Sequence, residues 1–240
     1  MLKIKHVLLK WLSVLLIIAP TPVKIFLYRR VYGHKIGKHV RIGLVWIDVG
    51  KLEIGNYVVI GHFTRIKGIP EVQIGDHTTI AIGNTFTSTS EFTSPDAIAQ
   101  RGNCPKLIIG KHCGIAMLHY FDVQDTFIIG EFTTIAGVYS VFFTHYIDIT
   151  SNLQSVKPVK IGKYCMIGSS VRFAPGSHVP DYCVVGMGSV VTKAFNDTDS
   201  YTLLAGNPAR VIHQLPRNST YFHRNRGVVS SFTRLVDDLD

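Results

Sequence analysis

Histidine is the residue type best suited to moving protons near neutral pH, and this chain of 240 residues contains eleven of them. Five lie in short regular segments at positions expected to face outward, and we interpret them as solvated surface residues: His39, His62, His77, His112 and His178. His145 differs, because it follows the apolar run 141–143 and opens an irregular segment. Such a junction is expected to face a groove, so His145 is our candidate for chemistry.

A base of this kind needs a group that holds its second ring nitrogen. Asp148, three residues after His145, could do so, and a backbone carbonyl would serve equally well. With the ring held, a neutral imidazole can remove the proton of a hydroxyl as that hydroxyl attacks an electrophilic carbon. The two alternatives for the orienting group stay open at this point.

The four cysteines suggest packing rather than chemistry. Cys104, Cys113, Cys165 and Cys183 lack the close CxxC spacing of a zinc site, and they are too few for a disulfide scaffold. Three of them, Cys113, Cys165 and Cys183, occupy a position that Val, Ser and Thr fill elsewhere in a repeat. A reducing cytoplasm suits such thiols.

The repeat itself has a period of six residues. From residue 161 an apolar residue recurs at every sixth position, as Ile161, Ile167, Phe173, Val179, Val185 and Val191. Segments that begin Ile-Gly at 36, 54, 60, 74, 109 and 129 carry the same register. No helix or ordinary strand has this period. We expect each rung to be a short strand plus a corner, with three rungs closing a triangular coil and the apolar residue pointing inward.

The pattern divides the chain into three parts. Residues 34–213 form the predicted solenoid, interrupted by two segments that must loop out, 83–106 and 144–158. Residues 1–33 are apolar, and we expect helices at 4–18 and 22–32 that cap the solenoid or rest on the inner membrane face. The apolar run 11–19 is shorter than a bilayer span and makes a poor export signal. Residues 214–240 are a C-terminal tail.

The repeat resembles the hexapeptide-repeat acyltransferases over roughly residues 36–213. That resemblance implies an all-β fold, the left-handed parallel β-helix, and a homotrimer with active sites between neighbouring subunits. It also implies a coenzyme A thioester as the co-substrate, and we expect acetyl-CoA, because no extra apolar lid is evident near residues 185–213. A thiolate of pKa near about 8.5 departs readily, so we expect direct transfer in a ternary complex. The element FFTHYID looks like the one that carries the catalytic histidine in this family, so the resemblance makes His145 the general base.

The resemblance extends to the cofactor side. The stretches VGMGSVVTKAF at 185 and LLAGNPARVI at 203 look like the family's closing signature. It implies that Ser169 and Met187 line the pantetheine groove, that Thr192 and Lys193 lie by the distal part of the cofactor, and that Arg210 faces its phosphates. His213 stands where relatives often have a basic side chain, so cofactor affinity could be lower. The formal charge of +9 fits an anionic partner such as these phosphates.

Several functions remain open. We expect acetylation of a sugar hydroxyl in the biosynthesis of a surface polysaccharide, with an amino sugar or an antibiotic as the alternative acceptor. A γ-type carbonic anhydrase would need zinc-binding histidines, but His34 and His39 are five apart and His112 and His119 seven apart, so no metal is expected. A non-catalytic scaffold would have no use for His145. Nucleic acid is not expected, because no binding motif accompanies the basic residues.

Overall fold

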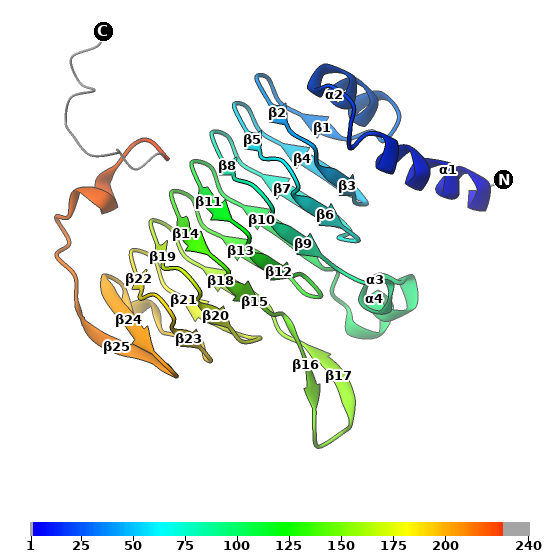
Figure 1. Cartoon of the computed structure of the whole chain (residues 1–240). Coiled ribbons are helices and arrows are strands. Elements are labelled where there is room, and N and C mark those ends of the chain that lie inside the picture. Colours follow the sequence, from blue (N-terminus) through cyan, green and yellow to red (C-terminus); the bar gives the residue numbers. More distant parts are fainter. Residues whose placement is uncertain (1, 228–240) are drawn as a thin grey trace, which may run out of the picture.

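The computed structural model describes residues 2–227, most of which form short parallel strands wound into a three-sided column (Figure 1). Each coil contributes one strand to each face. The first face contains β1 (Lys35–Ile36), β4 (Lys51–Ile54), β7 (Glu71–Ile74), β10 (Lys106–Ile109), β13 (Phe127–Ile129), β18 (Val159–Ile161) and β21 (His178–Val179).

The other two faces follow the same order along the column. The second contains β2 (Arg41–Ile42), β5 (Val59–Ile60), β8 (Thr79–Ile80), β11 (Gly114–Met117), β14 (Thr134–Val138), β19 (Met166–Ile167), β22 (Val184–Val185), β24 (Thr202–Gly206) and the antiparallel β25 (Ala209–Gln214). The third contains β3 (Trp46–Asp48), β6 (Arg65–Lys67), β9 (Thr85–Thr87), β12 (Tyr120–Asp122), β15 (Val141–Phe142), β20 (Arg172–Phe173) and β23 (Val190–Val191).

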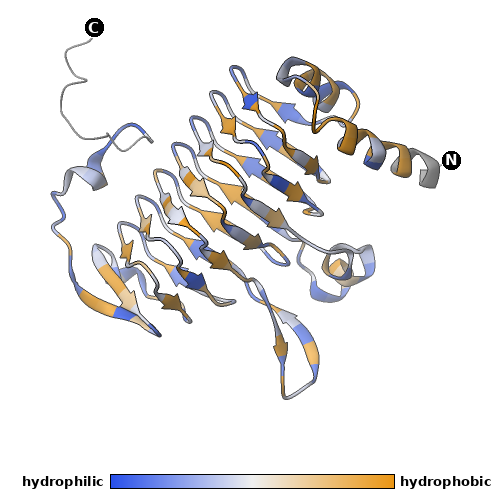
Figure 2. Ribbon diagram, in the orientation of Figure 1, coloured by the Kyte–Doolittle hydropathy of each residue, from blue (hydrophilic) through white to orange (hydrophobic). Residues whose placement is uncertain are grey.

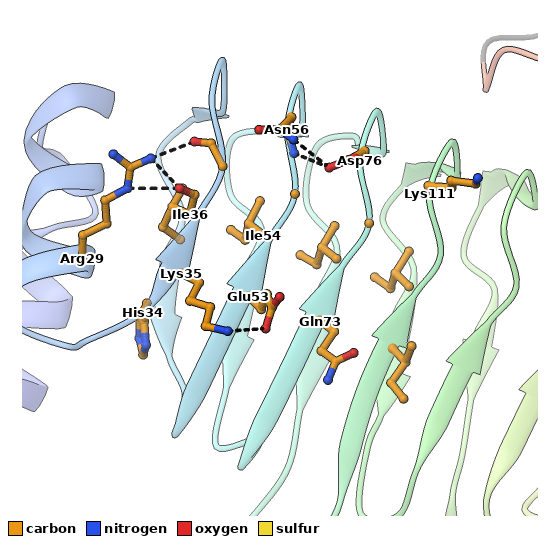
Figure 3. Close-up of a pocket in the computed structure, with 16 residues that line it drawn as sticks. Arg29, His34, Lys35, Ile36, Glu53, Ile54, Asn56, Gln73, Asp76 and Lys111 are labelled. Carbon is orange, nitrogen blue, oxygen red and sulfur yellow. Dashed lines mark hydrogen bonds and ion pairs between the residues drawn. The ribbon is translucent and has the colours of Figure 1, made fainter.

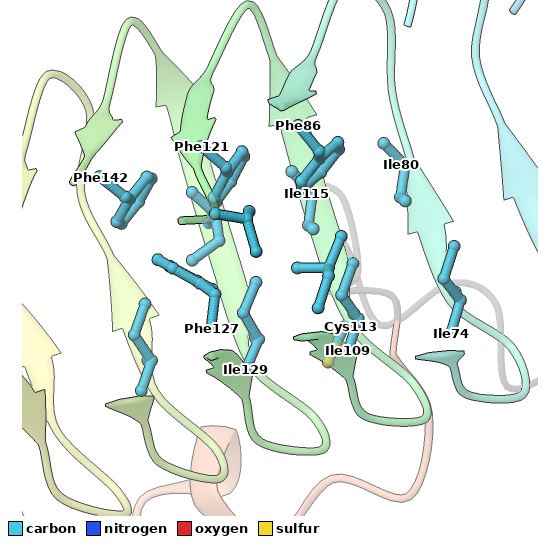
Figure 4. Close-up of a cluster of buried hydrophobic side chains, with 14 of the residues drawn as sticks. Ile74, Ile80, Phe86, Ile109, Cys113, Ile115, Phe121, Phe127, Ile129 and Phe142 are labelled. Atoms are coloured by element: carbon cyan, nitrogen blue, oxygen red, sulfur yellow. The ribbon is translucent and has the colours of Figure 1, made fainter. Parts of the chain in front are cut away.

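The six-residue beat sets the register between coils. Ile36 pairs with Ile54, and Ile54 with Ile74, so the inward residues form a column along the first face. On the third face Phe121 lies between Phe86 and Phe142, with ring centroids 4.4 and 4.5 Å apart (Figure 4). Burying a side chain of this size contributes about 1.5–3 kcal/mol. Stacked inward side chains therefore stabilise the column along its whole length.

The glycine after the inward residue is needed for close packing of coils. A Cβ on Gly130 would lie 2.5 Å from the carbonyl carbon of Gly162 in the next coil. Gly130 does not have a positive φ, so the reason is this approach and not a left-handed turn. Instead, large residues adopt positive φ at the corner between the first and second faces, where Tyr57 has φ 57° and stacks between His39 and His77.

The outward histidines match the prediction in part. His39, His62 and His77 are exposed, whereas His112 and His178 are half-buried. His112 stacks between the rings of His77 and Phe132 in neighbouring coils, and burial lowers its pKa. A solenoid covers an outward side chain with its equivalents one coil above and below, so such residues are less solvated than a single strand suggests.

The predicted packing role of the cysteines is confirmed for three of them. Cys113, Cys165 and Cys183 are 1%, 0% and 0% exposed. Burial raises the pKa of all three thiols, which disfavours the reactive thiolate.

Both predicted N-terminal helices are present, as α1 (Leu2–Leu15) and α2 (Thr21–Arg30). Helix α2 covers the first coil. Tyr28 and Lys24 are buried, and the Lys24 ammonium donates to the carbonyl oxygens of Ile17 and Gly43. Arg29 donates through Nε to the Ile36 oxygen at 3.1 Å and through Nη2 to the Gly37 oxygen at 3.0 Å (Figure 3). These bonds hold the helices on the open end of the column, as a cap must.

The two predicted excursions leave the same corner, after third-face strands. The first is shorter than expected, because Thr85–Thr87 still pairs within the third face, and it contains α3 (Ser90–Thr93) and α4 (Pro95–Arg101). The second is an antiparallel hairpin of β16 (His145–Asp148) and β17 (Leu153–Val156). Its boundaries agree with the prediction.

A short 3₁₀ segment, η1 (Asp197–Asp199), precedes β24, and the tail after β25 contains a second one, η2 (Thr220–His223). Phe222 in η2 packs edge-on against Tyr182 and Tyr201 of the column. The predicted tail thus folds back on the solenoid as far as it is described, and residues 228–240 lie outside the described part of the chain.

The stacked column predicts a large effect of one core deletion. Phe121→Ala removes the middle ring of the third-face stack and leaves a cavity. We therefore expect the free energy of unfolding to fall by about 3–5 kcal/mol. Chemical denaturation followed by circular dichroism measures this change. Ile149→Ala is the matched control, because this side chain is 88% exposed. Equal stability of the two variants would contradict the packing described above.

Candidate functional site

The site lies at the corner where third-face strands turn toward the first face. Strands β9, β12 and β15 belong to three successive coils, and the excursions follow β9 and β15. Strand β12 lies between them and ends at Asp122, while β15 is followed by His145 after two residues. Figure 1 shows α3, α4 and the β16–β17 hairpin projecting from this edge of the column.

Asp122 is the group that holds His145. Its Oδ2 lies 2.9 Å from Nδ1 of the histidine, and the carboxyl is buried with 2% of its side chain exposed. Oδ2 also accepts from the backbone N–H of Thr144 at 2.9 Å. A buried carboxylate needs such donors, because burial without partners is costly.

This bond decides which nitrogen of His145 is free. An ionised carboxylate only accepts hydrogen bonds, so Nδ1 of a neutral His145 carries the proton and Nε2 keeps its lone pair. The side chain is 33% exposed, and within residues 2–227 no hydrogen bond engages Nε2. The ring is thus fixed in the tautomer that a general base requires, with its basic nitrogen accessible.

A buried hydrogen-bond network extends from Asp122 to the first excursion. Gln124 donates from Nε2 to Asp122 Oδ1 at 2.9 Å, and its Oε1 accepts from the Ser88 hydroxyl at 2.7 Å and the Thr89 N–H at 3.1 Å. Residues Ser88 and Thr89 precede α3. The start of one excursion is therefore tied to the carboxylate that orients the histidine at the start of the other.

Two aromatic rings lie close to the histidine. Phe92 of α3 lies 5.5 Å from the His145 ring, centroid to centroid, and Phe143 packs edge-on at 6.1 Å. Gln154 of β17 donates to Glu91 of α3 at 2.6 Å, which joins the two excursions directly. Segments more than fifty residues apart thus form the walls around one imidazole.

Asp148 is not the orienting group. It points its Oδ1 to the backbone N–H of Thr150 at 2.9 Å, and this bond is the main reason that its pKa is lowered. Residues three apart on a strand face opposite sides, which explains why Asp148 cannot reach His145. Sequence reasoning missed Asp122, because a strict period of six from Ile129 would align Phe121 with Val141. An extra residue in β14 shifts the register by one, so that Phe121 pairs with Phe142 and Asp122 comes to the corner of His145.

Three predicted cofactor residues lie together. Thr192, Lys193 and Arg210 line a pocket of about 470 Å³ at the C-terminal end of the column. Thr192 and Lys193 follow β23, so they occupy the same corner as His145. The strand ends that carry them, β15 and β23, are two coils apart, or about 10 Å along the axis at ~4.8 Å per coil.

The other two predicted residues lie at a different corner, between the second and third faces. Ser169 accepts from the Gly188 N–H through its backbone oxygen at 2.9 Å, and its hydroxyl bonds to the Val138 backbone. Met187 is 76% exposed in the adjacent coil. The width of the third face separates this pair from Lys193, so one subunit does not bring all five residues together.

Another pocket lies far from His145, on the N-terminal part of the first face (Figure 3). Its charged groups already have partners, as in the Lys35–Glu53 pair at 3.7 Å and the bonds of Arg29 to the backbone oxygens of the first coil. Its histidine, His34, is buried, and burial lowers the pKa of that ring to about 4. Within residues 2–227, no group of three or more His, Cys, Asp or Glu side chains is arranged to hold a metal ion.

Sequence comparison gives two informative partial matches, although no protein-family model matches the chain. A stretch of 75 residues, 31% of the chain, is 39% identical to the galactoside O-acetyltransferase of Escherichia coli (strain K12) and covers 36% of that protein. A stretch of 134 residues, 54% of the chain, is 28% identical to a chloramphenicol acetyltransferase of Morganella morganii and covers 60% of it. The chain thus spans less than two thirds of the length of either relative.

Structural comparison agrees on the fold. The polySia specific acetyltransferase NeuO matches with a TM-score of 0.54 over 84% of this chain and 85% of that one, at 20% sequence identity. The protein is therefore a left-handed parallel β-helix, as the sequence predicts. The predicted resemblance to hexapeptide-repeat acyltransferases is likewise confirmed by these relatives.

The hydrogen bond to Asp122 predicts the tautomer of His145. At about pH 8, ¹⁵N NMR should place the proton on Nδ1, and Asp122→Ala should abolish that preference. His119 is an internal reference, because its Nδ1 accepts from the Ser140 N–H at 3.1 Å and its proton must lie on Nε2. A proton on Nε2 of His145 in the unaltered protein would contradict the geometry.

Proposed function

We propose that this protein is an acetyl-CoA-dependent acyltransferase that acetylates a sugar hydroxyl in the biosynthesis of a surface polysaccharide. The observation that carries the proposal is the His145–Asp122 pair, which leaves Nε2 accessible between two excursions. A β-helix that served only as a scaffold would have no need of a buried carboxylate that fixes the tautomer of an accessible imidazole. The partial matches to acetyltransferases support the same class.

His145 acts as the general base. Its Nε2 removes the proton of the acceptor hydroxyl as the oxygen attacks the thioester carbonyl. Asp122 stabilises the imidazolium that forms, as a buried carboxylate partner does in other His–Asp pairs. The C–S bond then breaks: the leaving sulfur, whose thiol has a pKa near about 8.5, departs as a thiolate and takes the proton from the imidazolium, so no covalent acyl-enzyme is needed. A backbone N–H at the corner stabilises the negative charge on the carbonyl oxygen.

Lys193 and Arg210 bind the phosphates of the cofactor. Both side chains line one pocket, at the corner between the third and first faces where His145 also lies. Cations of this kind pair well with phosphate oxygens. Asp199 lines the same pocket and opposes this attraction in part. Ser169 and Met187 then line the pantetheine arm from the corner of a neighbouring subunit, which requires the homotrimer implied by the family resemblance.

The acceptor class rests on the relatives and on the walls of the site. Phe143 lies beside His145, is 40% exposed and offers apolar surface to the face of a sugar ring, whereas Phe92 is buried and only packs near the imidazole. An amino sugar or an aromatic antibiotic would use the same base, and the match to a chloramphenicol acetyltransferase favours the antibiotic as the second candidate. We place the reaction in the cytoplasm, where acetyl-CoA is formed, at the inner face of the membrane.

The test of this function is a screen of sugar, amino-sugar and chloramphenicol acceptors with acetyl-CoA. The release of free thiol measures turnover. We expect turnover with a sugar hydroxyl, a loss of about 10²–10⁴-fold in His145→Ala, and a smaller loss in Asp122→Asn. Coenzyme A affinity should stay within about twofold in both variants, because neither residue lies in the Lys193 pocket. Normal turnover by His145→Ala would exclude it as the base.

The cofactor pocket predicts a phosphate-dependent loss of affinity. Lys193→Gln combined with Arg210→Gln should weaken coenzyme A more than dephospho-coenzyme A, because only the former carries the 3′-phosphate. Calorimetry measures both affinities. Lys157→Gln is a matched control, since this cation lies on the second excursion, 5.2 Å from the Tyr146 ring. Equal weakening of both ligands would place the two side chains elsewhere on the cofactor.

A further inference from the structure

The net charge of the chain is concentrated in its first 47 residues. This segment holds nine of the 25 Lys and Arg residues and none of the 16 Asp and Glu residues, the first of which is Asp48. The remaining 193 residues therefore contain 16 basic and 16 acidic side chains. The whole formal excess of +9 belongs to the N-terminal helices and the first coil, and not to the end that carries Lys193 and Arg210.

Helix α1 and the turn after it are apolar on two opposite sides. One stripe, Leu9, Leu12, Ser13 and Leu16, is buried or half-buried against the column, where Ser13 accepts a hydrogen bond from the Trp46 indole at 3.2 Å. The opposite stripe is exposed and consists of Val7, Leu8, Trp11, Val14, Leu15 and Ile18, and we name it the N-terminal apolar surface. A soluble helix normally turns polar residues to this side.

The exposure of this surface is large. Trp11, Leu15 and Ile18 are 67%, 65% and 77% exposed. Figure 2 shows hydrophobic turns on α1 interrupted by a polar one, and Figure 1 shows the helix projecting from the end of the column. Within residues 2–227 no helix is long and apolar enough to cross a bilayer. Helix α1, with 14 residues and its inner stripe packed on the column, is suited to lie along a membrane interface.

We propose that the N-terminal apolar surface binds the surface of an anionic lipid bilayer, with α1 in the plane of the interface. Trp11 and the aliphatic side chains beside it enter the boundary between headgroups and acyl chains. Lys10 is exposed on the same helix, Arg30 is exposed at the end of α2 and Lys38 is exposed in the first coil; none of the three forms an ion pair within residues 2–227. Cations at this position attract acidic headgroups.

Charge favours a bilayer over a second copy of this segment. Contact between two copies of residues 1–47 would bring together nine cations from each and no carboxylate. Like charges at an interface without counter-charge oppose association. An anionic bilayer supplies both the counter-charge and an apolar layer. The stripe on the other side of α1 is already buried against the column. The side of the helix that faces away from the bilayer therefore contacts the solenoid, whereas in an isolated amphipathic helix it would contact water.

Sedimentation with lipid vesicles tests the proposal on the full chain and needs no enzyme assay. We expect the protein to bind vesicles of phosphatidylethanolamine with about one third phosphatidylglycerol, and to bind pure phosphatidylcholine at least about tenfold more weakly. Trp11→Ser combined with Leu15→Ser should lower binding to the anionic vesicles at least about tenfold. Both side chains are exposed, so circular dichroism and the melting temperature should stay unchanged.

The matched control is Phe63→Ser combined with Ile82→Ser, which removes two exposed apolar side chains, 70% and 45% exposed, from the column. Vesicle binding by this control should equal that of the unaltered protein. The proposal is overturned by absence of binding to the anionic vesicles, by equal binding to both lipid mixtures, or by equal loss in the control. Loss of oligomer mass in Trp11→Ser/Leu15→Ser, seen by light scattering together with absence of vesicle binding, would assign the surface to a second copy instead.

Discussion

The structure depends on stacking equivalent residues of successive coils at the spacing of a parallel β-ladder. Each coil sends its backbone N–H and C=O groups to the coils above and below, so an inward side chain must pack against its own equivalents. Aliphatic and aromatic columns such as Phe86, Phe121 and Phe142 satisfy this requirement. A polar residue in such a column would lie between two apolar neighbours with no partner.

The same spacing makes the candidate site possible. Asp122 and His145 are 23 residues apart, yet they belong to adjacent coils at one corner, and this brings Oδ2 and Nδ1 to 2.9 Å. The column is rigid there because Phe121 and Phe142 are locked in the stack directly before these residues. The excursions can vary without disturbing the coils, since they leave from a corner. Gln124 links the first excursion to the carboxylate, so a change in that excursion reaches the base through three hydrogen bonds, Ser88–Gln124, Gln124–Asp122 and Asp122–His145.

The solenoid also separates tasks along its axis. The N-terminal end carries the helices and the entire charge excess, the middle carries the His145–Asp122 pair, and the C-terminal end carries the pocket of Lys193 and Arg210. From composition alone, the net charge of +9 could be assigned to binding the cofactor phosphates. Its excess lies instead in residues 1–47, at the opposite end of the molecule. A repeated scaffold permits this arrangement, because each coil contacts only its neighbours and can be altered almost independently.

The amino-acid sequence by itself determined the class of fold, the position of both excursions, the burial of three cysteines and the singular place of His145. These features follow from a local rule, the period of six, which recurs over many rungs of the sequence. Only the tertiary structure decided that Asp122 and not Asp148 holds the imidazole, that Thr85–Thr87 stays in the column, and that Ser169 and Lys193 lie at different corners. Those outcomes depend on which residues of different coils share a corner, and local departures from the period of six, such as the extra residue in β14, change that register.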